Sequence, residues 1–120
     1  MIEAFLGLGS NIGDKAGHLK SAVSLLSQVD GINVSAVSSI YRTEPIGLVD
    51  QDAFFNAVVR IETTLEPLAL LDQCLEIERS RGRLRLERWG PRTLDIDLLL
   101  FGDRQLEEEA LTLPHPFAAE

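Results

Sequence analysis

Apolar and polar residues follow two different periods along this chain, and the change of period marks its secondary structure. Apolar residues recur at every third or fourth position over 14–30, and again between Thr64, the predicted N-cap, and Gly82, which is typical of amphipathic helices. Apolar or alternating segments that end at turn-forming residues predict strands at 2–8, 32–41, 54–63 and 94–101, with a short extended piece at 111–113. This order predicts an α+β fold with a ferredoxin-like β-α-β-β-α-β core, a mainly antiparallel sheet with helices packed on one face.

The second helix carries an acidic residue on its predicted core-facing side. Leu68, Leu71 and Leu75 define that side, and Glu78 continues the series three residues later. An acid there either reaches water or serves a site, and the pattern leaves both readings open. Cys74, on a flanking stripe, is interpreted as a core residue, not a nucleophile.

Residues 94–101 are apolar throughout except for Asp95 and Asp97. So apolar a segment predicts a central strand that is buried on both faces. Residues two apart on a strand point to the same side, about 6.5–7 Å apart along it. Two carboxylates held so close repel each other, and a hard divalent cation such as Mg²⁺ is the simplest compensation. Taken alone, the pair fits a solvent-facing strand end equally well.

Arginines concentrate immediately before this strand. The window 79–92 holds six of the eleven basic residues and a single acid, Glu87, so it carries +5 in a chain of net charge −8. The six are Arg79, Arg81, Arg83, Arg85, Arg88 and Arg92. Guanidinium groups bind phosphate oxygens in a bidentate manner. Beside a candidate Mg²⁺ pair, they indicate phosphoryl transfer to or from a nucleotide.

Composition narrows the class of protein. With 120 residues, 45% of them hydrophobic, the chain is long enough for one domain with a single core. The net charge of −8 argues against general nucleic-acid or membrane-surface binding, and no signal peptide or long apolar span is present. One cysteine allows no intrachain disulfide, which fits a reducing, cytoplasmic compartment.

Three weaker signals remain. Residues 42–52 form a long connection and are therefore a candidate binding loop. Asn56 is polar in the apolar start of its strand, so it needs a partner, either neighbouring backbone or a ligand. The glycine-rich segment 7–14 lacks the Gly-Lys-Ser/Thr of a P-loop and is read as a turn, and His18 is read as a solvated surface residue.

Together these residues resemble the 6-hydroxymethyl-7,8-dihydropterin pyrophosphokinase family. The most specific block is Trp89-Gly-Pro-Arg-Thr-Leu-Asp-Ile-Asp97. Further matching blocks run in the family's order at 7–11, 41–47, 55–57, 77–78, 82–83, 100–102 and 113–116. The resemblance implies transfer of the terminal pyrophosphate of ATP, as one unit, to the hydroxymethyl oxygen of the pterin, with release of AMP, in tetrahydrofolate biosynthesis. It also implies two Mg²⁺ ions, with ATP as co-substrate.

The resemblance also implies a role for individual residues. Asp95 and Asp97 match the metal-binding aspartates. The positions that match catalytic residues are Arg83 and Arg92, which brace the phosphates, and Trp89, on a catalytic loop that closes over the site. Those that match ATP-binding residues are Glu78, Arg88, Arg92, Leu98, Thr112 and His115. Those that match the pterin pocket are Thr43, Glu44, Ile46, Phe54 and Asn56, with Phe54 at the place of a stacking aromatic.

The sequence departs from the family pattern near its end. Family chains continue with an Arg-x-Phe segment, whereas this sequence stops at Glu120, and Ala110 replaces a basic residue that some members have. We therefore expect one pyrophosphokinase domain over 1–120, C-terminally short, acting as a monomer on small-molecule substrates. The alternative is a non-catalytic nucleotide- or pterin-binding fragment. An RNA-binding role for Trp89 is disfavoured, because the residues outside 79–92 carry −13 once +5 is taken from −8.

Overall fold

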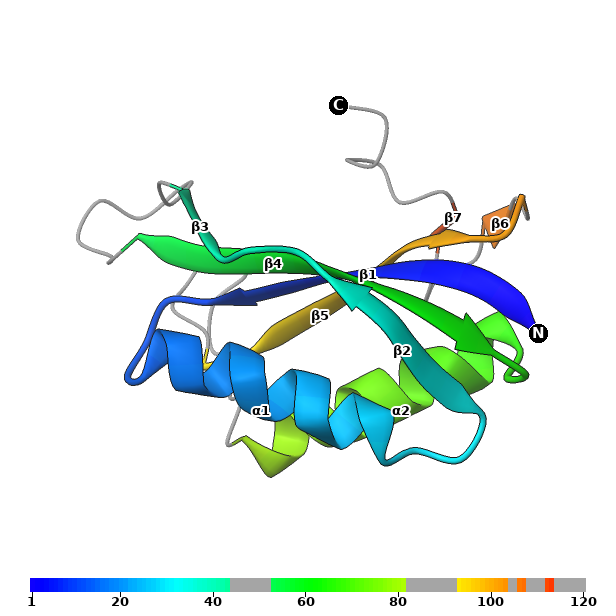
Figure 1. The fold of residues 1–120 in the computed structure, drawn as a ribbon, viewed down its shortest axis with the longest axis horizontal. Helices are drawn as coiled ribbons and strands as arrows, with labels where there is room; N and C mark the ends of the chain where they lie inside the picture. The colour runs from blue at the N-terminus through cyan, green and yellow to red at the C-terminus, as the bar shows by residue number, and fades with distance from the viewer. Residues whose placement is uncertain (44–52, 82–92, 104–105, 108–111, 114–120) are drawn as a thin grey trace.

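The structure is a computed structural model that describes residues 1–43, 53–81, 93–103, 106–107 and 112–113. Its elements follow one another along the chain as the periodicity predicts, with short additional strands (Figure 1). They are β1 (Ile2–Ser10), α1 (Lys15–Ser27), β2 (Ile32–Val37), β3 (Tyr41–Thr43), β4 (Phe54–Thr63), α2 (Pro67–Ser80), β5 (Asp95–Phe101), β6 (Leu106–Glu107) and β7 (Thr112–Leu113).

The main sheet has the strand order β2-β4-β1-β5, and β3 pairs with β4 beyond the end of β2. All these pairings are antiparallel. Both helices cover the same face of the sheet: α1 packs under β1, β2 and β4, and α2 packs under β5 (Figure 1). The predicted α+β, ferredoxin-like arrangement is confirmed, and the separate β6–β7 pair is added to it.

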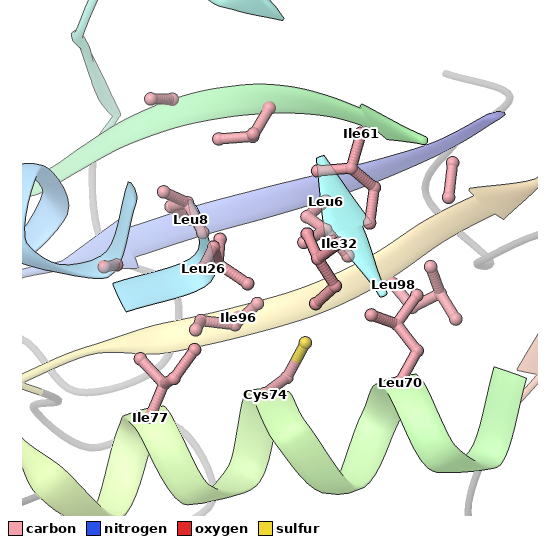
Figure 2. Close-up of a cluster of buried hydrophobic side chains, with 14 of the residues drawn as sticks. Leu6, Leu8, Leu26, Ile32, Ile61, Leu70, Cys74, Ile77, Ile96 and Leu98 are labelled. Atoms are coloured by element: carbon pink, nitrogen blue, oxygen red, sulfur yellow. The ribbon is translucent and has the colours of Figure 1, made fainter. Parts of the chain in front are cut away.

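The core lies between the sheet and the helices and is built by alternation along each strand. Alternate residues in the middle of β1, β4 and β5 point toward the helices and are almost fully buried (Figure 2). The strand residues are Ala4, Leu6, Leu8, Ala57, Val59, Ile61, Ile96 and Leu98, and the helices add Leu19, Ala22, Leu26, Leu70, Cys74 and Ile77. Burying each of the larger side chains contributes roughly 1.5–3 kcal/mol.

Helix α1 begins with a side-chain cap, whereas α2 begins with a proline. The carboxylate of Asp14 accepts the backbone N–H of Gly17 at 3.1 Å. Pro67 occupies the first turn of α2, where a missing N–H costs nothing, and the N-cap is Glu66, whose side chain does not cap the helix N–H groups. The predicted cap at Thr64 is therefore wrong: its backbone N–H donates to the carbonyl of Gly31 instead.

The core-facing side of α2 differs from the prediction. Leu70, Cys74 and Ile77 point into the core (Figure 2), whereas Leu68 is 43% exposed. Two adjacent stripes of α2 are apolar, so periodicity alone could not choose between them, and packing against β5 decides. Glu78 is buried because it lies one turn after Cys74, not because it continues the Leu68 series.

Two strand predictions also need correction. In the described sheet β5 is an edge strand, not a central one, and one of its faces is only partly covered, with Leu100 37% exposed. The predicted strand 32–41 is two strands, β2 and β3, and the β2–β4 register shifts between Val34 and Ala36. None of the described helices is long and apolar enough to span a membrane.

Candidate active site

Asp95 and Asp97 lie at the start of β5, on the face of the sheet opposite the helices. Their neighbour Ile96 points into the core, so the two-residue period sends both aspartates to the other side, as the sequence predicts. Both are half-buried. Two hard oxygen donors on one strand face suit Mg²⁺, which commonly takes one or two protein carboxylates and fills its remaining positions with water and phosphate oxygens. No cluster of three or more metal-ligating side chains occurs among the described residues.

Glycines of β1 separate these aspartates from β4. Gly9 pairs with Asp95 on one side and Asn56 on the other, and Gly7 pairs with Asp97 and with Val58. No side chain of β1 therefore stands between the aspartates and β4, and the Leu99 side chain lies against Gly7, with Cδ1 3.4 Å from a Cβ built there. A Cβ at Gly9 would lie 3.3 Å from Asn56 Oδ1, closer than most Cβ contacts. The sequence interpretation treated these glycines as part of a turn. Their alternate spacing within a strand was the missed signal, since glycine in a strand often marks close approach.

The Asn56 side chain is held from the β3 side. Its Nδ2 donates to Thr43 Oγ1 at 2.8 Å and to the carbonyl oxygen of Phe54 at 3.4 Å. A carbonyl can only accept, so this contact fixes which end of the amide is the nitrogen. Oδ1 consequently lies over Gly9. The ring of half-buried Phe54 is at the same place, with Cδ1 3.7 Å from a Cβ built on Gly9. The structure thus brings together Thr43, Phe54, Asn56 and the aspartate pair.

Glu78 reaches the site from behind, through the backbone of β5. The residue is 3% exposed, and its Oε2 accepts the backbone N–H of Ile96 at 2.7 Å. The sequence left open whether the Glu78 side chain reaches water, and the structure shows that it does not. Burial, together with the negative charges of Glu78 and Asp97, raises the pKa of the nearby Cys74 thiol to about 12. Cys74 is a core residue, as predicted.

Two other predicted ATP-site residues belong to described strands. The Leu98 side chain is 2% exposed and points into the core, so a nucleotide at this strand would meet its backbone. Thr112 belongs to β7 and pairs with Glu107 of β6. The remaining predicted site residues lie outside the described residues: Glu44, Ile46, Arg83, Arg88, Trp89, Arg92 and His115.

Polar groups accumulate at the same end of the sheet. Two buried hydroxyls, Ser10 Oγ at the end of β1 and Thr93 Oγ1 just before β5, have no hydrogen-bond partner among the described residues. A buried hydroxyl without a partner costs about 1–3 kcal/mol, which native proteins tolerate chiefly at functional sites.

His18 is not the freely solvated residue that the sequence predicted. Its Nδ1 lies 3.2 Å from Nε and 3.1 Å from Nη2 of Arg81. An arginine only donates, so Nδ1 accepts and the imidazole proton is on Nε2. The contact ties α1 to the C-terminal end of α2, where the arginine-rich window continues.

Comparison with known proteins assigns this arrangement to a family. Residues 5–120 match the family described as 7,8-dihydro-6-hydroxymethylpterin-pyrophosphokinase. Three bacterial proteins named 2-amino-4-hydroxy-6-hydroxymethyldihydropteridine pyrophosphokinase are similar over nearly the whole chain. The protein of Methylorubrum extorquens is 53% identical over 120 residues, which are 100% of this chain and 76% of that protein.

The other two relatives have comparable sequence identity to this chain. The Bacillus subtilis protein is 50% identical over 113 residues, 94% of this chain and 68% of the relative. The Haemophilus influenzae protein is 45% identical over 115 residues, 96% of this chain and 72% of the relative. The chain therefore belongs to the 7,8-dihydro-6-hydroxymethylpterin-pyrophosphokinase family.

Proposed function

We propose that this chain transfers pyrophosphate from ATP to the hydroxymethyl group of 6-hydroxymethyl-7,8-dihydropterin, giving the pterin diphosphate and AMP in folate biosynthesis. The observation that carries the proposal is the row Asn56, Gly9 and Asp95 across three paired strands. An amide suited to a heterocycle edge and a carboxylate suited to a metal thus share one face, with only glycine backbone between them.

The aspartates form the phosphate end of the proposed site. Asp95 and Asp97 would hold two Mg²⁺ ions, which neutralise the phosphate oxygens of ATP when bound. Because both side chains project from a strand paired with β1, their spacing is fixed before the substrate arrives. Such positioning removes part of the entropic barrier to transfer.

Asn56 forms the pterin end. Its Oδ1 is directed over Gly9 by the contact of Nδ2 with Thr43, so it offers an acceptor to an N–H group of a flat ring. Phe54 offers an aromatic face beside it, and such faces stack on heterocycles. On the family resemblance, we place Thr43, Glu44 and Ile46 around the same ring.

The resemblance supplies the remaining ATP contacts. Arg83, Arg88 and Arg92 would bind phosphate oxygens through their guanidinium groups. Trp89 would close over the reacting groups. Leu98, through its backbone, with Thr112 and His115 would bind the nucleotide, and Glu78 lies at the same end, behind β5.

We further propose that residues 1–120 act as a single domain, as a monomer and in the cytoplasm. The buried thiol of Cys74 fits a reducing compartment, because it forms no disulfide. Sedimentation of the purified chain tests the oligomeric state.

Release of AMP from ATP, with Mg²⁺ and the pterin, tests the function. We expect turnover that requires Mg²⁺ and falls at least about 100-fold in Asp95→Asn and in Asp97→Asn, since each change removes a charge that holds the metal. Asp72→Asn, an exposed aspartate on α2, is the matched control and should retain turnover. Full activity in both site variants would refute the metal assignment. Ligand binding without AMP release would favour the non-catalytic alternative.

A further inference from the structure

We infer that Glu78 is a positioning residue, whose carboxylate holds the backbone of β5 so that Asp95 and Asp97 keep their places on the substrate face. The inference rests on the proposed role of the two aspartates. It gives Glu78 a task in the protein itself, distinct from contact with ATP.

The contact lies at the residue that separates the aspartates. Glu78 Oε2 accepts the N–H of Ile96 at 2.7 Å, and both residues are 3% exposed. Hydrogen bonds to a charged acceptor are short and stronger than neutral ones, and this distance is at the short end. Any rotation of the peptide at Ile96 would turn the neighbouring side chains at the same time.

The strand needs such a contact because it is an edge strand of the described sheet. Alternate N–H groups of an edge strand point away from the neighbouring strand and lack a ladder partner. At Ile96 the side chain of Glu78 takes the place of a further strand. The pairing of Leu8 with Ile96 and of Gly7 with Asp97 holds the opposite side of β5.

The placement of Glu78 does not suit a third ligand for a metal held by Asp95 and Asp97. Its helix, α2, packs on the covered face of the sheet, whereas the aspartates project from the other face. The described residues contain no group of three carboxylates able to share an ion. Glu78 therefore reaches the aspartates through the peptide backbone.

Amide hydrogen exchange of the ¹⁵N-labelled chain tests the contact directly. Glu78→Met keeps the length of the side chain but removes the strong acceptor, and we expect exchange at Ile96 to accelerate by about tenfold or more. Glu78→Gln keeps an acceptor oxygen, and slow exchange at Ile96 should persist. Glu76→Met is the matched control on the exposed side of the same helix. Unchanged protection of Ile96 in Glu78→Met would overturn the inference.

Turnover separates positioning from ATP contact. We expect Glu78→Met to lower kcat by about tenfold or more, with KM for ATP changed less than about threefold, because displaced reacting groups slow the chemical step. Glu78→Gln should recover most of kcat. If Glu78→Met does not fold, Glu78→Gln decides alone. Slow exchange at Ile96 with an unchanged KM for ATP supports positioning, and fast exchange there or a raised KM overturns it.

The two measurements also separate this inference from the proposed function. Hydrogen exchange at Ile96 is measured without substrates, so its result does not depend on whether the chain forms AMP. Full turnover in Asp95→Asn and Asp97→Asn would refute the metal assignment and leave the Glu78–Ile96 contact intact. Unchanged exchange in Glu78→Met would refute the inference and leave the function intact.

Discussion

The two faces of the sheet are built from the same strands and serve different purposes. On the helix-covered face, β1 presents Leu6 and Leu8, and both are buried among other apolar side chains. On the opposite face the same strand presents Gly7 and Gly9, flanked by aspartates on β5 and an asparagine on β4. On one face β1 contributes apolar side chains to the core, and on the other it contributes no side chain at these two positions, where side chains of the neighbouring strands lie against it.

The difference shows how a small domain can keep polar chemistry without losing its core. Because side chains alternate with a period of two, adjacent residues belong to different faces. Ile96 contributes to the core, and the aspartates on either side of it do not. Substitutions on the covered face should therefore reduce stability, whereas substitutions on the open face should reduce catalysis.

The largest expected effect is on the covered face. Leu6 is fully buried and faces Val59 and Leu98 on the neighbouring strands. Leu6→Ala should lower the free energy of unfolding by about 2–5 kcal/mol, through lost burial and a residual cavity. Urea unfolding measures it. The control, Val58→Ala on the open face, should cost about 1 kcal/mol. Equal losses in both variants would contradict the division between the faces.

Much of this comparison could be predicted from the sequence, because it depends on period. Alternation alone placed Asp95 and Asp97 on one face, and it marked Asn56 as a polar residue in need of a partner. The helix–strand order was sufficient for the topology. These are local properties, and local patterns are what a sequence displays directly.

The pairing of distant segments was not predictable. The edge position of β5 depends on which strand pairs with it, and an apolar run does not specify that. The contact of Asn56 with Thr43 requires the register of β3 on β4, and that of Glu78 with Ile96 requires α2 to pack on β5. The glycines of β1 acquire their meaning only once Asn56 is known to lie beside them.

Gly9→Ala would test whether the open face needs a residue without a side chain beside Asn56. The added Cβ would lie 3.3 Å from Asn56 Oδ1, so the amide must move. We expect KM for the pterin to rise about tenfold, comparable to the loss of one good hydrogen bond, with the free energy of unfolding changed by less than about 1 kcal/mol.

A double-mutant cycle tests whether Gly9 acts through Asn56. In an Asn56→Ala background, Gly9→Ala should have little further effect on the pterin KM, because the displaced group is gone. Additive effects of the two substitutions would show that Gly9 acts by another route.

The thiol of Cys74 tests how strongly burial and two nearby carboxylates act on a titratable group in the core. Its pKa is raised from 9.0 to about 12 by burial first and then by the charges of Glu78 and Asp97. Below about pH 8 the thiol is neutral in both the folded and unfolded chains, so its contribution to stability is complete. Between pH 9 and 12 only the unfolded chain ionises, and that contribution is lost as pH rises.

Unfolding curves of the wild type and Cys74→Ala measure this loss. From pH 9 upward the wild-type free energy of unfolding should fall more steeply, by at most about 1.4 kcal/mol per pH unit. Below pH 8 the difference between the two proteins should be constant. Parallel pH dependences up to pH 11 would contradict the raised pKa of the thiol.

The smallest effect concerns Thr43, an exposed residue whose hydroxyl orients the amide of Asn56 from outside the sheet core. Thr43→Val keeps the shape and removes the acceptor for Asn56 Nδ2. We expect KM for the pterin to rise about fivefold, within the range of one neutral hydrogen bond, with no measurable loss of stability. Thr43→Ser retains the hydroxyl and should restore the wild-type KM. If the valine variant binds the pterin as well as the wild type does, the contact with Phe54 alone suffices to orient Asn56. The open face would then depend on backbone for its geometry, whereas the covered face depends on packed side chains.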